Sequence, residues 1–175
     1  MPSKQGEVVA KILKNKAHSI GAEIGVWRGT FAFKILNGLP GIQKYYCIDL
    51  WKHYDDHTAI LRPDGKMAKA NMDKVYKTFK EQAKVFGSRI VIYRMTSIDA
   101  SKIIPDNSLD FVYIDANHAY SYIKEDIKVW TPKVKTGGLV SGHDYGNKRF
   151  GVTQAVDEAF SNVKEIDGVW YIWKK

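Results

Sequence analysis

The stretch A-E-I-G-V-W-R-G-T, residues 22–30, passes from a short apolar run into glycine-rich sequence and then into a helical pattern. A short apolar run bounded by glycine is typical of a buried β-strand, and glycine allows a backbone to approach a neighbour or a ligand closely. We predict a strand at 22–27 that ends in a loop containing Gly25 and Gly29. A helix over 30–36 follows, so the stretch is expected to form the strand–loop–helix unit of α/β sheets.

Strands and helices alternate along the rest of the chain. Short apolar runs predict further strands at 45–50, 89–95, 109–115 and 137–144. Helical spacing of apolar residues predicts helices at 7–16, 66–86, 97–104, 120–130 and 152–160. The end of the chain is expected to form a hairpin, with strands at 163–166 and 169–173.

This alternation, with strands that are apolar on both faces, predicts an α/β fold. We expect a Rossmann-like, doubly wound and mostly parallel sheet that takes an antiparallel strand from the C-terminal hairpin. The length of 175 residues favours a single domain over residues 1–175. In such sheets ligands bind outside the carboxyl ends of the strands, so the polar residues that follow the strands are the candidate site.

Composition restricts the class of protein. The chain is 45% hydrophobic and 26% charged, as in globular proteins, and its single cysteine, Cys47, excludes an internal disulfide. It has no signal-peptide pattern and no run of about 18 apolar residues, so we predict a cytoplasmic protein without a membrane partner. The net charge of +8 leaves nucleic acid open as a partner. However, many lysines are dispersed over the helix expected at 66–86, which is typical of a solvated face.

The first two strand ends carry acids that suit different parts of one ligand. Glu23 precedes a glycine loop that is not the G-x-G-x-x-G pattern of pyrophosphate binding, and an acid there suits a cation such as an amino acid's ammonium group. Asp49 ends the second strand, where an acid accepts hydrogen bonds from ribose hydroxyls. An amino-acid end and a ribose together describe S-adenosylmethionine (SAM). The alternative is an ordinary tight turn with a charge at the start of the helix.

The segment D-F-V-Y-I-D-A-N-H-A-Y, residues 110–120, places Asp115 at the end of the fourth strand and His118 three residues later. Asp144 ends the fifth strand, and carboxylates at adjacent strand ends can share a cation such as Mg²⁺. An imidazole with a pKa near 6.5 is suited to take the proton from a hydroxyl that attacks a methyl group. The alternative is that Asp115 and His118 only cap the next helix, with Asn117 as the capping residue.

Four motifs resemble those of class I SAM-dependent methyltransferases. They are, in order, A-E-I-G-V-W-R-G-T-F-A, Y-Y-C-I-D-L-W, F-V-Y-I-D-A-N-H-A-Y and G-G-L-V-S-G-H-D-Y. More narrowly, these motifs and G-V-T-Q-A-V-D-E-A-F resemble the macrolide-sugar O-methyltransferases and the related methyltransferase domain 24 proteins. The resemblance extends from Glu7 to Trp173 and implies a class I fold, SAM as cofactor and a small-molecule acceptor.

The resemblance also implies roles in cofactor binding. Glu23 and Gly25 would hold the methionine end of SAM, Asp49 would hold the ribose, and Trp51 would cover the adenine or the crevice mouth. The segment Thr96-Ser97-Ile98 would flank the adenine. The full expected cofactor-binding set is Glu23, Gly25, Trp27, Gly29, Thr30, Asp49, Leu50, Trp51, Thr96, Ser97, Ile98 and Asp115.

For the reacting groups, the resemblance implies a divalent metal bound by Asp115, His143 and Asp144. Asp115 and His118 are the expected catalytic residues, with His118 as the general base. His143 stands where the relatives carry an acid, which weakens the case for Mg²⁺ and leaves Mn²⁺, Fe²⁺, Zn²⁺ or no metal open. Residues outside this set have other expected roles: Tyr120 and Tyr145 as pocket walls, and His53, Asp55, Asp56 and His57 as a lid or, alternatively, a second metal cluster.

We therefore expect a SAM-dependent methyltransferase that methylates a hydroxyl of a small molecule such as a sugar. N-methylation and a homo-oligomer stay open. One alternative is a nucleic-acid methyltransferase, which the charge of +8 motivates, although no N-P-P-Y motif is found. Another is a non-catalytic SAM-binding protein that regulates a partner. An NAD-dependent oxidoreductase is disfavoured because the dinucleotide glycine fingerprint is missing.

Overall fold

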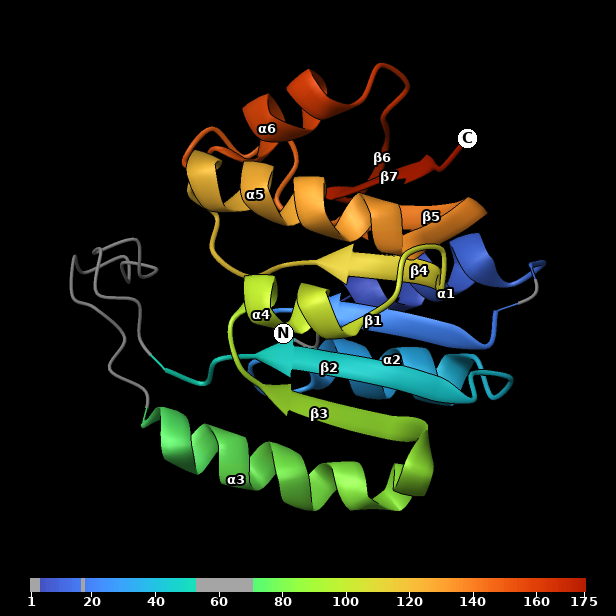
Figure 1. Ribbon diagram of the computed structural model, residues 1–175, viewed down its shortest axis with the longest axis vertical. Coiled ribbons are helices and arrows are strands. Elements are labelled where there is room, and N and C mark those ends of the chain that lie inside the picture. Colours follow the sequence, from blue (N-terminus) through green and yellow to red (C-terminus); the bar gives the residue numbers. More distant parts are fainter. Residues whose placement is uncertain (1–3, 17, 53–70) are drawn as a thin grey trace.

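The computed structural model describes residues 4–16, 18–52 and 71–175. Within these residues, seven strands form one sheet in the order β3-β2-β1-β4-β5-β7-β6 (Figure 1). The strands are β1 (Ile20–Ile24), β2 (Lys44–Asp49), β3 (Ile90–Arg94), β4 (Leu109–Ile114), β5 (Val134–Gly142), β6 (Lys164–Ile166) and β7 (Val169–Trp173). β1 to β5 pair in parallel, whereas β7 runs antiparallel to both β5 and β6. The predicted sheet, mostly parallel with an antiparallel C-terminal strand, is confirmed.

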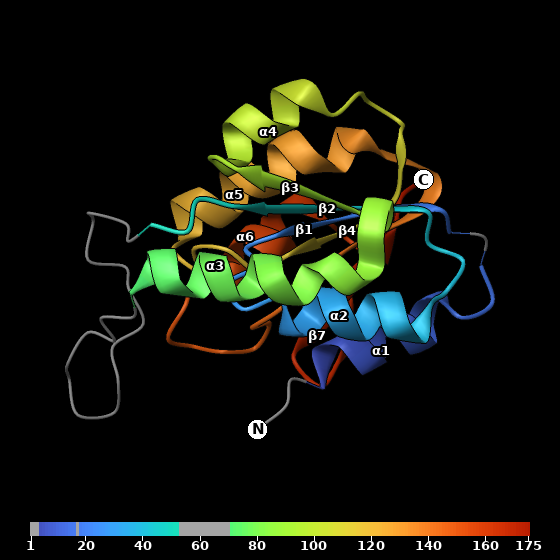
Figure 2. The same ribbon diagram turned by 90° about the horizontal axis from the view of Figure 1, so that it is seen from below.

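Helices cover both faces of this sheet. They are α1 (Gln5–Leu13), α2 (Thr30–Gly38), α3 (Met72–Ala83), α4 (Ser97–Ile103), α5 (Tyr120–Trp130) and α6 (Val152–Ala159). α1, α2 and α3 lie on one face and α4 and α5 on the other (Figure 2), where α6 packs beside α5. This arrangement explains why the central strands are apolar on both faces. Among the described residues, no helix is both long and apolar enough to cross a membrane.

Several helices differ from their predicted bounds. The first, expected over 7–16, is observed as α1 over Gln5–Leu13. The helix expected over 66–86 is observed as α3 from Met72, because the side chain of Asn71 accepts a backbone hydrogen bond in the first turn and caps it. The preceding residues of that prediction lie outside the described ranges. After α3 the chain forms a 3₁₀ turn, in which Gly87 leaves the helical conformation with a φ of 55°. α2 continues to Gly38, beyond its predicted end.

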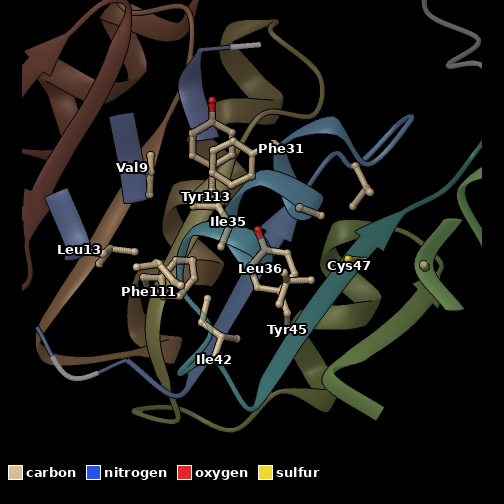
Figure 3. Packing of buried hydrophobic residues seen from close by; sticks show 14 of the residues in the cluster. Val9, Leu13, Phe31, Ile35, Leu36, Ile42, Tyr45, Cys47, Phe111 and Tyr113 are labelled. Atoms are coloured by element: carbon tan, nitrogen blue, oxygen red, sulfur yellow. The ribbon is translucent and has the colours of Figure 1, made fainter. Parts of the chain in front are cut away.

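Two apolar clusters, one on each face, hold the helices on the sheet. On the first face Leu13 of α1 and Ile35 of α2 pack with Phe111 of β4 (Figure 3). On the second face the indoles of Trp130 and Trp170 are fully buried. Burying a large apolar side chain contributes about 1.5–3 kcal/mol, so these clusters make the sheet a rigid support for the residues at its edge.

The order of the strands reverses between β1 and β4. In sheets of this kind ligands bind outside the carboxyl ends of the strands at such a point. Glu23 in β1 lies opposite Cys47 in β2 and Tyr113 in β4. The backbone pairing continues past the end of β4, where the Asp115 amide donates to the carbonyl oxygen of Ile24 (2.8 Å). Because successive side chains of a strand alternate between faces, Asp115 extends on the same face as Tyr113 and Glu23.

A buried polar chain connects α4 with α5. The indole Nε1 of Trp130 donates to the hydroxyl of Ser97 (2.7 Å), and this hydroxyl donates to the carboxyl of Asp126. Asp126 is only 5% exposed, and its burial raises the pKa of the carboxyl to about 7. The carboxyl therefore keeps its proton in the folded protein at pH values where it is ionised in the unfolded chain.

Replacing Asp126 by asparagine is expected to remove part of the pH dependence of stability. The folded pKa of about 7 lies above the ordinary value near 4, so the folded state holds an extra proton between these values. The free energy of unfolding should therefore fall as the pH rises from about 4 to about 7, by up to about 4 kcal/mol. Between pH 5 and pH 8, urea unfolding should show a loss of stability about 2–3 kcal/mol smaller in Asp126→Asn than in the wild type. Equal pH dependence of the two proteins would contradict it.

Candidate active site

The loop after β1 is held by Asp49, the last residue of β2. Its Oδ2 accepts hydrogen bonds from the amides of Val26 (2.9 Å) and Trp27 (2.8 Å). Its Oδ1 accepts a further bond from the amide of Trp51 (2.6 Å). Burial raises the pKa of Asp49, although the three backbone hydrogen bonds act against this shift. Asp49 therefore orders the segments that follow both β1 and β2.

Gly25 brings this loop against the end of β4. Its φ is 89°, and a Cβ at this position would lie 2.3 Å from the backbone oxygen of Asp115. Both the conformation and the close approach require glycine. The loop then reaches Gly29, which is also left-handed, and the exposed Thr30 begins α2. The predicted cofactor loop and the predicted catalytic acid are thus parts of one site.

Trp27 and Trp51 both have left-handed backbone conformations, with φ of 48° and 44°. Such conformations are rare for bulky residues and cluster at functional sites. The Trp51 indole donates to the carbonyl oxygen of Trp27 (2.8 Å), and its ring is fully buried against Tyr76 and Phe79 of α3. Its ring therefore does not cover the crevice mouth as predicted. Trp27 is 52% exposed, with the guanidinium of Arg28 4.5 Å from its ring centre, so Trp27 is the tryptophan of the pair that a ligand can reach.

Glu23 is buried within the sheet. Its side chain accepts a hydrogen bond from the hydroxyl of Tyr45 (3.3 Å), and the residue is 2% exposed. Burial, together with the negative charges of Asp115 and Asp49, raises the pKa of Glu23 well above its usual range. Without a compensating cation, burial favours the protonated form of the carboxyl. The predicted role of Glu23 toward an ammonium group therefore requires that the cation reach a buried acid.

The segment expected near the adenine lies at the start of α4. Thr96 caps the helix, because its hydroxyl oxygen accepts a hydrogen bond from the amide of Asp99 (3.1 Å). The Ser97 hydroxyl is already engaged in the buried chain to α5. Ile98 and, after β2, Leu50 are partly buried. The polar side chains here have partners within the protein, so a contact with the adenine would have to come from backbone groups.

Asp115, His118 and Asp144 meet at the point where the strand order reverses. The Nε2 atom of His118 lies 3.1 Å from Oδ1 of Asp115 and 3.0 Å from Oδ2 of Asp144. Asp144 has a left-handed backbone, with a φ of 59°, and its Oδ1 accepts a hydrogen bond from Asn147 (3.1 Å). One ligand atom from each of the three residues lies within 4.8 Å of the others. The two carboxylates at this spacing can hold a divalent cation, and the His118 imidazole lies directly beside them.

His143 does not belong to this group of three. Its Nδ1 lies 3.3 Å from Oδ2 of Asp144, and its Nε2 lies 3.0 Å from the amide nitrogen of Gln5 in α1. Of the predicted metal set, the two carboxylates thus come together with His118, and His143 contacts Asp144 from another position. Sequence reasoning missed Gln5, because nothing in the pattern of α1 marks it and the contact spans 138 residues.

The carboxylates control the charge of both imidazoles. Burial alone would lower the pKa of His118, but the hydrogen bonds and charges of Asp115 and Asp144 outweigh it and raise the pKa to about 9. The same balance raises the pKa of His143. Asp144 would gain a higher pKa from burial, yet its hydrogen bonds to two imidazoles and an amide lower its pKa well below the usual range. At neutral pH the group is therefore an ion pair network around a protonated His118.

The loop after β5 closes over this cluster. The ring of Phe150 stacks on His118, with the ring centres 4.7 Å apart, and the amide of Gly151 donates to the His118 carbonyl oxygen (3.0 Å). Sequence reasoning missed Phe150, since no spacing signal links it to His118.

Tyr120 and Tyr145 were predicted as pocket walls, but the hydroxyl of each donates to a carboxylate of α6 (2.6 Å in both cases).

Two further predictions concern the surroundings of the site. Asn117 was predicted to cap the following helix, but Ala119 occupies the capping position, and the Asn117 side chain accepts a hydrogen bond from the Ala119 amide (3.0 Å). It therefore orders the turn before α5 rather than the helix itself. The expected lid or second metal cluster, formed by His53, Asp55, Asp56 and His57, lies outside the described residues.

The doubly wound sheet, the glycine loop after β1 and the acid at the end of β2 define the class I fold of SAM-dependent methyltransferases. Residues 22–145 match the Methyltransf_24 model, a methyltransferase domain. The chain belongs to this family and is a SAM-dependent methyltransferase. No curated protein sequence matched it.

Solved structures agree on the fold. The O-methyltransferase NovP is 19% identical with a TM-score of 0.70, over 98% of this chain and 79% of that one. The SAH-bound methyltransferase PaMTH1 of Podospora anserina is 15% identical with a TM-score of 0.69, over 100% and 80%. A putative caffeoyl-CoA O-methyltransferase from Staphylococcus aureus is 14% identical with a TM-score of 0.66, over 98% and 82%. At these identities the similarity concerns the fold.

Proposed function

We propose that the chain transfers the methyl group of SAM to a hydroxyl of a small molecule, such as a sugar, with the help of a divalent cation. The observation that carries this proposal is the cluster of Asp115, His118 and Asp144 beside the glycine loop. The sulfonium of SAM already activates the methyl group, so the protein has to align the acceptor and remove one proton. Two carboxylates and an imidazole are the groups that these tasks require.

The proposed position of SAM follows the loop after β1. Its ammonium group is directed toward Glu23. Burial disfavours the ionised form of this carboxyl, and the positive charge of the ammonium group would stabilise that form, which supports the assignment. Its ribose is directed toward Asp49, whose oxygens accept backbone hydrogen bonds and keep further lone pairs for hydroxyl donors. Its adenine lies near the backbone of Thr96 and Ser97. The exposed ring of Trp27 borders the same loop.

The proposed reacting groups are Asp115, Asp144 and His118. A divalent cation bound by the two carboxylates would supply positive charge that favours the alkoxide form of the acceptor. His118 accepts the hydroxyl proton at Nε2. In the cation-free protein this nitrogen already carries a proton at neutral pH, because the carboxylates raise its pKa to about 9. A cation bound to the two carboxylates would neutralise them and remove the cause of the raised pKa of His118. Occupancy of the metal site and the base function of His118 are therefore coupled.

The names of two structural relatives support a hydroxyl acceptor. NovP and the Staphylococcus aureus protein are described as O-methyltransferases, the second of them as a putative caffeoyl-CoA enzyme. An amine acceptor would also have to give up a proton to a base such as His118. It would, however, have less need of a cation, since no alkoxide forms.

The test is methyl transfer from SAM to a panel of sugars, polyols, catechols and amines. We expect S-adenosylhomocysteine to form with a hydroxylated acceptor, to fall at least about 10-fold with EDTA, and to recover with Mg²⁺ or Mn²⁺. Asp144→Asn should abolish the recovery, because it removes one carboxylate from the site. Asp106→Asn, an exposed acid paired with Lys133, is the matched control and should behave as the wild type. Turnover with amines alone, unaffected by EDTA, would contradict the proposal.

A further inference from the structure

The first helix reaches the candidate metal site through one side chain. Gln5 begins α1, and its Nε2 atom lies 3.0 Å from Nε2 of His143 at the end of β5. An amide nitrogen can only donate, so the imidazole nitrogen in this contact has to be the acceptor. The hydrogen of a neutral His143 is then on Nδ1, the nitrogen that lies 3.3 Å from Oδ2 of Asp144.

This assignment satisfies both contacts of His143 with a single proton. With the Gln5 amide in the opposite orientation, its oxygen would need a hydrogen on Nε2, and a neutral ring would have none left for Asp144. The remaining amide atom of Gln5, Oε1, is buried and has no partner among the described residues. Since turning the amide would only exchange one unpaired atom for the other, the contact with His143 decides its orientation.

The position of Asp144 depends on hydrogen bonds from neighbouring side chains. Its left-handed backbone (φ 59°) is uncommon for a residue other than glycine and persists only where the surroundings hold it. Asn147 donates to Oδ1, while Oδ2 faces both His118 and His143. Removing the donor at His143 would leave Oδ2 held by His118 alone, which is the group that must change its proton during the proposed reaction.

We propose that Gln5 is a positioning residue that fixes the Nδ1–H tautomer of His143 and thereby holds Asp144 in place for a divalent cation. The proposal rests on the proposed function only in assigning Asp144 to a metal site. Residues that orient a metal ligand through a hydrogen bond typically change metal affinity by about 10–100-fold when they are replaced. Gln5→Met keeps the length of the side chain and removes its donor. Gln43→Met, an exposed glutamine before β2, is the matched control.

The first readout needs no activity and no metal. Long-range ¹⁵N–¹H NMR spectra of the imidazoles, recorded on the full chain at pH 8.5, report which ring nitrogen carries the hydrogen. We expect Nδ1–H for His143 in the wild type and in Gln43→Met. In Gln5→Met, where only the contact with Asp144 favours Nδ1–H, we expect a measurable population of the Nε2–H tautomer. The second readout is calorimetric titration with Mn²⁺, for which Gln5→Met should bind at least about 10-fold more weakly than both other proteins.

An unchanged Nδ1–H tautomer and a Mn²⁺ affinity within about twofold of the wild type in Gln5→Met would overturn the proposal. The failure of the proposed function has a different signature. If the wild type binds no Mn²⁺ but Gln5→Met still mixes the tautomers of His143, the metal site is refuted and the control of His143 by Gln5 is supported.

Discussion

Replacing His118 by alanine is expected to lower turnover by about 100-fold or more while the affinity for SAM stays nearly unchanged. The imidazole is the group of the site that can take the acceptor proton at Nε2, and it lies between the two carboxylates. Its loss removes the base but leaves the loop after β1, which Asp49 holds, intact. Steady-state kinetics at saturating SAM and calorimetric titration with SAM measure the two quantities separately.

The control for this variant is Lys148→Ala, because Lys148 is an exposed basic residue of the loop that follows Asp144. It should retain wild-type turnover and SAM affinity. A turnover of His118→Ala within a few-fold of the wild type would refute the base assignment. The histidine would then be a support for Asp115 and Asp144 in the protein, and the acceptor proton would have to leave to solvent.

Replacing Asp49 by alanine should weaken SAM binding by about 100-fold. The variant removes the acceptor of three backbone amides at once, and hydrogen bonds to a charged group contribute about 1.5–3 kcal/mol each. The left-handed conformations of Trp27 and Trp51 lose their support, so the loop proposed to contact the cofactor has to be reordered on binding. The proposed acceptor of the ribose hydroxyls is lost as well.

Two comparison variants separate the contributions of Asp49. Asp49→Asn keeps one oxygen acceptor and should show an intermediate loss of affinity, whereas Asp106→Ala removes an exposed acid and should show none. Calorimetry with SAM measures all three. An affinity of Asp49→Ala close to that of the wild type would mean that neither the ribose contact nor the order of the loop contributes to binding.

The sequence predicted the fold well because hydrophobic periodicity and glycine positions carry that information locally. The turn at Asp167-Gly168 and the helix over Tyr120–Trp130 are set by residues close in sequence, and they are observed where the patterns indicated. The first strand, expected over 22–27, is observed over Ile20–Ile24, because Gly25 already leaves the extended conformation. The end of α2 was predicted less well, since Gly38 is tolerated in the last turn of a helix that packs on the sheet.

The site was predicted only in part, for a physical reason. Rules about strand ends bring Asp115 and Asp144 to one edge, but they do not specify rotamers or the contacts of buried side chains. Trp51 turned inward onto α3 because its indole finds an acceptor at Trp27 and an aromatic neighbourhood there. Gln5 approaches His143 only after the whole chain has folded, so no local pattern could reveal it.

In the proposed function, the carboxyl edge of the sheet binds SAM beside a divalent cation. Calorimetric titration of the purified protein with SAM and S-adenosylhomocysteine, each with and without Mn²⁺, measures both ligands at once. We expect micromolar binding of both compounds and a separate heat of Mn²⁺ binding that Asp144→Asn removes. Absence of SAM and S-adenosylhomocysteine binding under all conditions would mean that this edge of the sheet is not a cofactor site.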